Sequence, residues 1–231
     1  MTLSPEEWTA ILLSLRVALL ATLICVPIAT GLAWLLTHKN FWGKSALNSV
    51  IHLPLVLPPV VTGYLLLIAF GKRGVIGAFL EHYFGLVFSF RWTGAALAAA
   101  VMALPLTVQA IRVSMEVIDR RLEGAAATLG AGPLRVFLTV TLPLAAPGLL
   151  AGTMITYVKA LGEFGATITF VSSIPGETQT LALSIYSLLQ TPEGDGAALR
   201  LTFLSMALAF LALLASELLS KRLSRGMRGE T

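Results

Sequence analysis

Long apolar stretches dominate this sequence and restrict it to a membrane fold. A helix needs about 20 mostly apolar residues to cross roughly 30 Å of hydrocarbon. About five stretches reach this length, at residues 8–36, 47–70, 92–112, 142–159 and 199–219. Inside a bilayer each segment must satisfy its own backbone N–H and C=O groups, so we expect every stretch to be helical.

The composition agrees with a membrane protein. Of the 231 residues, 56% are hydrophobic and 12% are charged, whereas soluble domains average about 45–50% and 25%. We therefore predict an all-α, polytopic membrane protein in which residues 1–231 form a single transmembrane domain. Two further apolar stretches, 75–90 and 164–189, are broken by Gly, Pro, Ser or charged residues. They are predicted to be either interfacial or re-entrant.

Basic residues are divided unequally between the two predicted sides of the membrane. One side holds Lys39, Lys44, Arg112, Arg120, Arg121, Arg135, Lys221, Arg222, Arg225 and Arg228, and the other holds Lys72, Arg73 and Arg91. Cytoplasmic loops carry the excess of Lys and Arg in membrane proteins. The bias predicts an outside N-terminus and a cytoplasmic C-terminus, and it explains the net charge of +4 by topology rather than by nucleic-acid binding. Acidic residues precede the first stretch, so we expect it to stay as an anchor rather than act as a cleaved signal.

Several kinds of chemistry lack the residues they need. Cys25 is the single cysteine, and His38, His52 and His82 show no metal-ligand spacing. The sequence contains no GxxxxGK[ST] phosphate-binding motif. We therefore predict no catalytic residue, no metal site and no cofactor bound by this chain. Transport against a gradient would need energy from a partner.

Proline and glycine interrupt the apolar stretches. In the second stretch, the sequence HLPLVLPPVVTGY contains three prolines, a threonine and a glycine, namely Pro54, Pro58, Pro59, Thr62 and Gly63. Broken backbone at membrane depth is tolerated where protein or a water-filled cavity satisfies the freed groups. Two interpretations stay open, a helix kinked for packing or a distorted helix beside a pathway. In the fourth stretch, Gly148 and Gly152 allow close helix packing, either within the chain or between two copies.

A polar segment at 120–141 separates the third and fourth stretches. Its apolar residues recur at i, i+3, i+4 and i+7, as Leu122, Ala125, Ala126 and Leu129, which predicts a short helix. Gly130 and Gly132 would end that helix, and Pro133 suits the first turn of another. The residues alone allow two interpretations. The helix is either a ridge that seats in a groove of another protein or an amphipathic helix lying on lipid headgroups.

This segment resembles the signature cytoplasmic loop of permeases from binding-protein-dependent ABC importers. The pattern comprises an acid, paired alanines, a glycine and a final Leu-Pro, here Glu123, Ala125, Ala126, Gly130, Leu142 and Pro143. Glu123 lies one residue earlier than the family's usual acid, and Gly124 occupies that usual position. The resemblance implies the ABC importer permease fold, with a cytoplasmic coupling helix in about 120–141 that docks into a cleft of an ATPase subunit.

The resemblance extends over essentially the whole chain. The stretch LGEFGATITFVSSIPGETQT is similar to the molybdate permeases, which are close kin of the sulfate/thiosulfate permeases. This implies a homodimer in the bacterial inner (plasma) membrane, two cytoplasmic ABC ATPases that bind ATP and Mg²⁺, and an external molybdate-binding protein. Sulfate, thiosulfate and tungstate stay open as substrates. A stand-alone secondary transporter or channel is the less favoured alternative of another class.

A tetrahedral dianion needs hydrogen-bond donors along its path, because an unpaired buried charge is strongly unfavourable. We expect the pathway or its gate to include Pro58, Pro59, Thr62, Gly63, Thr156, Lys159, Glu163 and Thr167. Glu163 would repel an anion unless paired, and Lys159, one helical turn earlier, is the expected partner. We therefore assign Glu163 a structural or gating role. Lys159 could instead extend to the lipid headgroups.

Overall fold

The chain folds into helices joined by turns and loops. The computed structural model describes the backbone of residues 4–228 and the side chains of 4–215 and 218, and this part contains no strand. In chain order the elements are α1 (Pro5–His38), α2 (Lys44–Val56), α3 (Pro59–Phe70), α4 (Val75–Phe84), α5 (Trp92–Glu116), α6 (Arg120–Thr128), α7 (Pro133–Val136), the π-helix η1 (Phe137–Thr141), α8 (Leu142–Leu144), α9 (Ala146–Leu161), α10 (Gly165–Val171), α11 (Leu181–Leu189) and α12 (Asp195–Arg228). The all-α prediction is confirmed.

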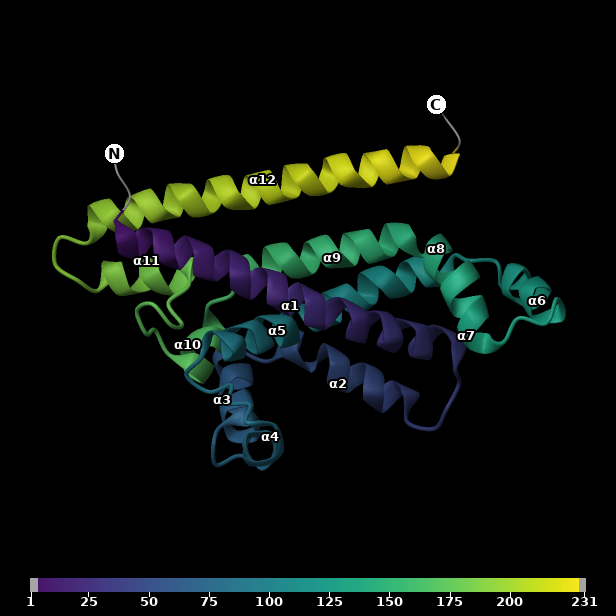
Figure 1. Cartoon of the computed structure of the whole chain (residues 1–231), viewed down its shortest axis with the longest axis horizontal. Helices are drawn as coiled ribbons and strands as arrows, with labels where there is room; N and C mark the ends of the chain where they lie inside the picture. The colour runs from purple at the N-terminus through teal and green to yellow at the C-terminus, as the bar shows by residue number, and fades with distance from the viewer. Residues whose placement is uncertain (1–3, 229–231) are drawn as a thin grey trace.

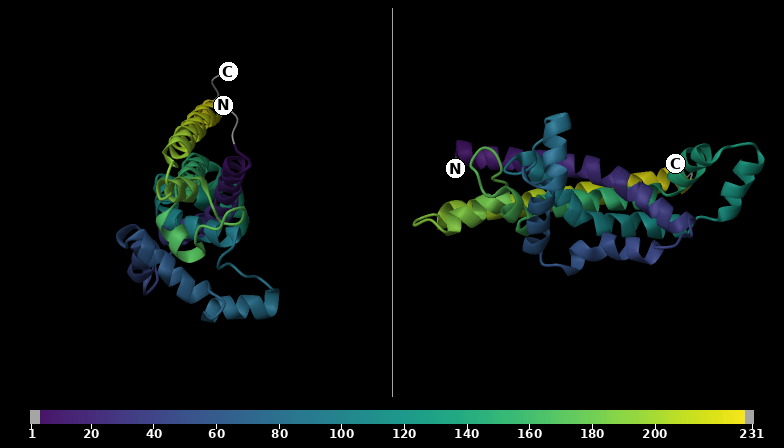
Figure 2. Two further views of the ribbon diagram at one scale, coloured as in Figure 1. Left: turned by 90° about the vertical axis from the view of Figure 1, so that its left-hand side faces the viewer. Right: turned by 90° about the horizontal axis from the view of Figure 1, so that it is seen from below.

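The long helices form an elongated bundle. Figure 1 shows α1, α5, α9 and α12 running roughly along its long axis. Helices α10 and α11 and the start of α1 lie toward one end, which we call the α11 end. Helices α6 and α7 lie at the opposite end, which we call the α6 end. Helices α3 and α4 project sideways from the bundle in Figure 1 and in the left view of Figure 2.

Helix α1 begins with a capping box. Ser4 Oγ accepts a hydrogen bond from Glu7 N at 3.1 Å, and Glu7 Oε2 accepts one from Ser4 N at 2.7 Å. These bonds satisfy N–H groups that the first turn of a helix leaves free. Pro5 occupies the first turn, where its missing N–H loses no helical bond. The helix covers the predicted stretch 8–36 and continues beyond it at both ends.

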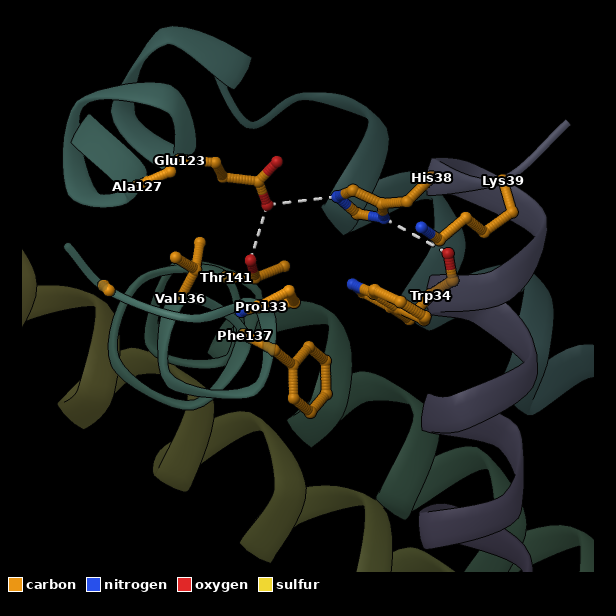
Figure 3. Close-up of a pocket in the computed structure, with 10 residues that line it drawn as sticks. Trp34, His38, Lys39, Glu123, Ala127, Pro133, Val136, Phe137 and Thr141 are labelled. Atoms are coloured by element: carbon orange, nitrogen blue, oxygen red, sulfur yellow. Dashed lines mark hydrogen bonds and ion pairs between the residues drawn. The ribbon is translucent and has the colours of Figure 1, made fainter.

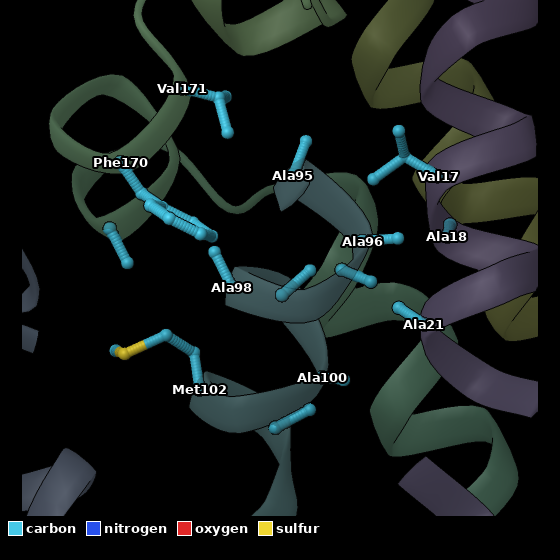
Figure 4. Close-up of a cluster of buried hydrophobic side chains, with 14 of the residues drawn as sticks. Val17, Ala18, Ala21, Ala95, Ala96, Ala98, Ala100, Met102, Phe170 and Val171 are labelled. Atoms are coloured by element: carbon cyan, nitrogen blue, oxygen red, sulfur yellow. The ribbon is translucent and has the colours of Figure 1, made fainter. Parts of the chain in front are cut away.

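Small side chains let α5 pack closely against its neighbours. The alanines of α5 without exposed surface are Ala95, Ala96, Ala98, Ala99 and Ala103. Within this cluster lie Val17, Ala18 and Ala21 of α1 and Phe170 of α10 (Figure 4). In lipid, apolar surface gains little by leaving its surroundings, so helices associate through tight van der Waals contact between small residues. The alanine-rich face of α5 therefore forms the centre of the bundle.

Helix α9 approaches α5 through its two spaced glycines. A Cβ on Gly148 would lie 2.3 Å from Ser114 Cβ, and one on Gly152 would lie 3.1 Å from Ile111 Cγ1. Larger side chains would push the two helices apart. The GxxxG spacing therefore serves packing within the chain, which decides between the two interpretations of the sequence.

The second apolar stretch, 47–70, is divided between two helices that meet at its paired prolines. Helices α2 and α3 meet at an angle of 118°. Leu57 and Pro58 both precede a proline, and both are extended, with ψ of 143° and 136°. A following proline ring disfavours the helical conformation of the residue before it. Two such residues in succession break the helix and turn α3 away from the bundle.

The fourth stretch is also bent, so the predicted span 142–159 extends across the junction of two helical segments. The segment Pro133–Leu144 meets α9 at 74°, and the bend lies at Ala145. Pro147 stands in the first turn of α9 and lacks the N–H that would continue the preceding helix. Leu142 and Pro143 therefore belong to the segment that leads back from α6, and α9 itself ends at Leu161.

Three helices of the described part are individually long and apolar enough to cross a membrane, and five spans result if each bent pair counts as one. The predicted stretch 199–219 falls within α12. The side chains of 216–217 and of 219 onward, with the basic residues from Lys221, lie outside the described residues. Stretches 75–90 and 164–189 hold α4, α10 and α11, of 10, 7 and 9 residues. Such helices are too short to cross a bilayer.

Candidate functional site

Helix α6 forms an exposed ridge at one end of the molecule. Asp119 caps it, since its Oδ1 accepts a hydrogen bond from Arg121 N at 2.9 Å. Every residue of α6 keeps some exposed surface. Gly130 follows with a φ of +87°, and Ala131 N donates to Ala126 O at 3.2 Å, which closes the C-terminal turn. Pro133 then starts α7.

The predicted signature residues lie on the two arms of this helix–turn–helix. Glu123, Ala125 and Ala126 are on α6, and Gly130 is in the turn. Leu142 and Pro143 lie farther along, in α8, after α7 and η1. Leu122, Leu129 and Leu134 expose 50%, 89% and 71% of their surface. A turn with this much exposed apolar surface is suited to contact with another protein.

Glu123 faces the bundle. Its Oε1 atom lies 3.0 Å from His38 Nε2 at the end of α1 and accepts a hydrogen bond from Thr141 Oγ1 of η1 (Figure 3). Trp34 stacks on His38, with ring centroids 5.5 Å apart, and Phe137 of η1 meets the Trp34 ring edge-on. The side chain of Glu123 thus joins three elements.

These residues line a cavity of about 360 Å³ between α1, α6 and η1. Sequence reasoning identified Glu123 and missed Trp34, His38 and Thr141. No local pattern could have found them, because 85 residues separate His38 from Glu123. The carboxylate of Glu123 is directed into this cavity (Figure 3).

The predicted pathway residues on α3 lie against α10. A Cβ on Gly63 would lie 2.5 Å from Ala166 O, and one on Gly165 would lie 2.6 Å from Pro59 Cβ. Thr62 is buried beside this contact, and its Oγ1 has no hydrogen-bond partner among the described residues. Three predicted residues therefore lie at or beside this contact, namely Pro59, Thr62 and Gly63. A fourth, Thr167, is buried in α10.

Lys159 and Glu163 do not form a direct ion pair. None of the ion pairs among the described residues joins them. Pairing one turn apart needs a continuous helix, but α9 ends at Leu161. Glu163 Oε1 instead accepts a hydrogen bond from Ala166 N at 2.9 Å, in the first turn of α10. Lys159 lines a groove between α9 and Leu213 of α12.

Thr156 lies inside the helix bundle. Its side chain is fully buried. The Thr156 Oγ1 atom lies 2.6 Å from Thr107 Oγ1 of α5 and donates to Gly152 O at 2.8 Å. The Cys25 sulfur of α1 is 3.9 Å away. Thr156 therefore belongs to the packing of α1, α5 and α9.

Comparison with known proteins identifies the family. Residues 25–225 match the family described as "Binding-protein-dependent transport system inner membrane component". The chain belongs to this family. It is 56% identical to the molybdenum transport system permease protein ModB of Escherichia coli K12, over 99% of this chain and 100% of that protein. It is 37% identical to the sulfate transport system permease protein CysW of Synechococcus elongatus, over 93% of this chain and 76% of that protein. A structure of a bacterial ABC transporter that imports alginate matches the fold with a TM-score of 0.74 at 18% identity. The match covers 95% of this chain and 80% of that one.

As a member of this inner-membrane family, the permease works within a transport system of several subunits. The fold of an ABC importer permease, predicted from the sequence, is confirmed by the structural match. The helix–turn–helix at the α6 end and the contact between α3 and α10 hold many of the residues predicted from the sequence. We treat them as its candidate functional sites.

Proposed function

We propose that the chain is the translocation subunit of an ATP-driven importer of molybdate. The observation that carries this proposal is the identity of 56% to a molybdenum permease over nearly the full chain, against 37% to a sulfate permease. The second value keeps sulfate or thiosulfate as the alternative substrate. Tungstate has nearly the same size and charge as molybdate and is expected to compete with it.

The α6 end supports energy supply by a partner ATPase. Helix α6 and its turn extend from the bundle, and Leu122 and Leu129 are exposed on them. A stand-alone transporter would have no use for such a ridge. We infer that the ridge is the coupling helix. In a dimer of the permease, each copy's ridge would dock into a groove of one of two ATPase subunits, which hold ATP and Mg²⁺. Ala125 and Ala126 would let the partner approach the backbone closely.

The basic residues at the α6 end support its assignment to the cytoplasm. Arg112, Arg120, Arg121 and Arg135 all lie in or next to the segment from the end of α5 to α7. Because cytoplasmic loops carry the excess of Lys and Arg, the N-terminus and α11 would then lie outside. An external molybdate-binding protein would deliver its ligand at the α11 end.

Two copies of the chain would enclose the pathway. Helix α3 projects from the bundle and exposes Val60, Tyr64 and Ile68 by 55%, 56% and 54%. A second copy would cover part of this surface. The Thr62 hydroxyl and the glycine-rich contact with α10 supply hydrogen-bonding groups without a fixed charge. This suits an anion that must pass without being trapped. Pro58 and Pro59 hold α3 in place by breaking it from α2.

Reconstitution tests the proposed function. Vesicles containing the permease, its ATPase and its molybdate-binding protein should take up labelled molybdate in the presence of ATP. Excess tungstate should inhibit this uptake strongly, and excess sulfate should inhibit it weakly. Vesicles without the ATPase serve as the control and should show no uptake. Equal uptake in that control would contradict the mechanism, and preferential uptake of sulfate would favour the alternative substrate.

A further inference from the structure

Glu123 connects α6 to the bundle, with which this helix otherwise makes little contact. Every residue of α6 is at least partly exposed. A turn after α5 and the glycine turn at Gly130 join α6 to its neighbours along the chain. Arg120 Nη2 donates to Thr37 O at 3.0 Å, but this bond lies in an exposed position. The half-buried contacts of Glu123 with His38 and Thr141 are therefore its main polar attachment to the membrane helices.

Thr141 forms a different hydrogen bond from several other helical threonines of the described part. Thr139 and Thr153 donate to the carbonyl one turn earlier, at Arg135 O and Leu149 O. Thr141 donates to Glu123 Oε1 instead, and its side chain is buried. Its position at the end of the π-helix η1 shifts it out of the regular α-helical register. Single π-turns inside helices often occur at functional sites.

His38 has both ring nitrogens next to acceptors. Nδ1 lies 3.2 Å from Trp34 O, and Nε2 lies 3.0 Å from Glu123 Oε1. A backbone carbonyl can only accept, so any hydrogen bond at Nδ1 is donated by the ring. When Nε2 carries the proton, it donates to the Glu123 carboxylate in a charge-assisted hydrogen bond. Stacking on Trp34 fixes the plane of the ring (Figure 3).

From these contacts, we propose that Glu123 is a positioning residue that transmits movement of α6 to α1 and to the helix leading into α9. This inference rests on the proposed function, since it assumes that an ATPase moves α6. Nothing lies within 4 Å of a Cβ placed on Gly130 or Gly132, so the turn between α6 and α7 is not packed against other residues at these two positions. Without a side-chain link, α6 could swing about this turn while the membrane helices stayed in place. Glu123 provides this link, on the side of α6 that faces away from the exposed leucines.

Isosteric variants in the complete transporter test this role. His38→Phe keeps a ring on Trp34 and removes both nitrogens, and Thr141→Val removes the hydroxyl at constant volume. Glu123→Ala removes the shared acceptor, and Glu123→Gln keeps an acceptor at the same reach. ATP hydrolysis and molybdate uptake are measured in the same vesicles, and the ATPase retained on the purified permease is quantified.

We expect ATPase retention to stay at the wild-type level in all four variants. Uptake per ATP hydrolysed should fall roughly 2- to 30-fold in His38→Phe, Thr141→Val and Glu123→Ala, the range expected when a coupling contact is lost. Glu123→Gln should recover part of the loss. The double variant His38→Phe/Glu123→Ala should be no worse than Glu123→Ala alone, because both remove one interaction. Glu116→Ala, which breaks an exposed pair with Arg112, is the matched control and should leave the ratio unchanged.

Two results would overturn the inference. The first is an unchanged ratio in His38→Phe and Thr141→Val. The second is loss of ATPase from Glu123→Ala with full retention in those two variants, which would place Glu123 in the docking surface. If Glu123→Ala fails to fold, His38→Phe and Thr141→Val still decide the question. Failure of the proposed function itself would be seen separately, as absence of ATP-dependent uptake in the wild type.

Discussion

At the scale of single residues, Gly130 shows how one backbone conformation shapes a docking element. Its φ of +87° lies in the region that glycine adopts easily, and the space around its missing Cβ is open. A side chain there would be unfavourable through backbone strain rather than through collision. For ordinary residues this conformation costs roughly 1–2 kcal/mol, and β-branched residues adopt it very rarely.

Gly130→Val should therefore distort the turn between α6 and α7 and weaken ATPase binding. We expect the purified permease to retain much less ATPase, while the amount inserted in the membrane stays normal. Gly132→Ala is the matched control, since Gly132 has a φ of −67° and equally open surroundings. Co-purification of the ATPase measures the effect. Normal binding and normal transport in Gly130→Val would argue against the docking assignment.

At the scale of elements, the contact between α3 and α10 depends on the absence of side chains. The two helices are so close that a Cβ placed on Gly63 or Gly165 would lie within 2.6 Å of an atom of the other helix. Helix α3 reaches this position because two successive residues before prolines, Leu57 and Pro58, break it from α2. The pathway proposal therefore depends on backbone approach as much as on side-chain chemistry.

Gly63→Ala should lower stability and transport together. Overpacking of a tight contact typically costs about 1–3 kcal/mol, and here it would push α3 away from Ala166. Gly31→Ala on α1 is the control, because nothing lies within 4 Å of its Cβ position. Alanine there should be neutral or stabilising, by up to about 1 kcal/mol. Thermal unfolding in detergent compares the two, and equal melting temperatures would contradict the close packing.

At the scale of the whole molecule, the bundle has two chemically different ends. At the α11 end, Glu7 of α1 accepts a hydrogen bond from Arg200 of α12 at 2.8 Å, which ties the last long helix to the first. At the α6 end, the chain leaves the bundle to form the exposed helix–turn–helix (Figure 1). A transporter whose ATPase binds on one side of the membrane needs two different ends, because its substrate arrives from the other side.

Thiol labelling tests the orientation of these ends. Ile174→Cys lies in the loop before α11, and Val117→Cys lies at the end of α5 beside α6. A reagent that cannot cross the membrane should label Ile174→Cys in intact cells, and it should label Val117→Cys after the membrane is opened. Cys25 is 1% exposed and should add little background. Labelling of Val117→Cys in intact cells would show that the α6 end lies outside, which is the opposite of the proposed orientation.

Local chemistry made much of this fold predictable from the sequence. Apolar stretches identified the long helices, Gly130 and Pro133 marked the turn after α6, and the prolines around Pro58 indicated a break. Each of these signals acts between residues no more than about one helical turn apart, or depends on side-chain polarity alone. Such interactions can be read along the chain because they do not depend on which helices become neighbours.

Tertiary structure alone decided how those helices meet. The 118° bend after α2, the burial of Thr156 against Thr107 and the capping of α10 by Glu163 could not be derived from spacing. Glu123 was visible as part of a motif, but its attachment to His38 depends on contact between residues 85 positions apart. The physical reason is that long-range packing selects among several locally acceptable conformations, and that selection requires the positions of all the neighbouring helices.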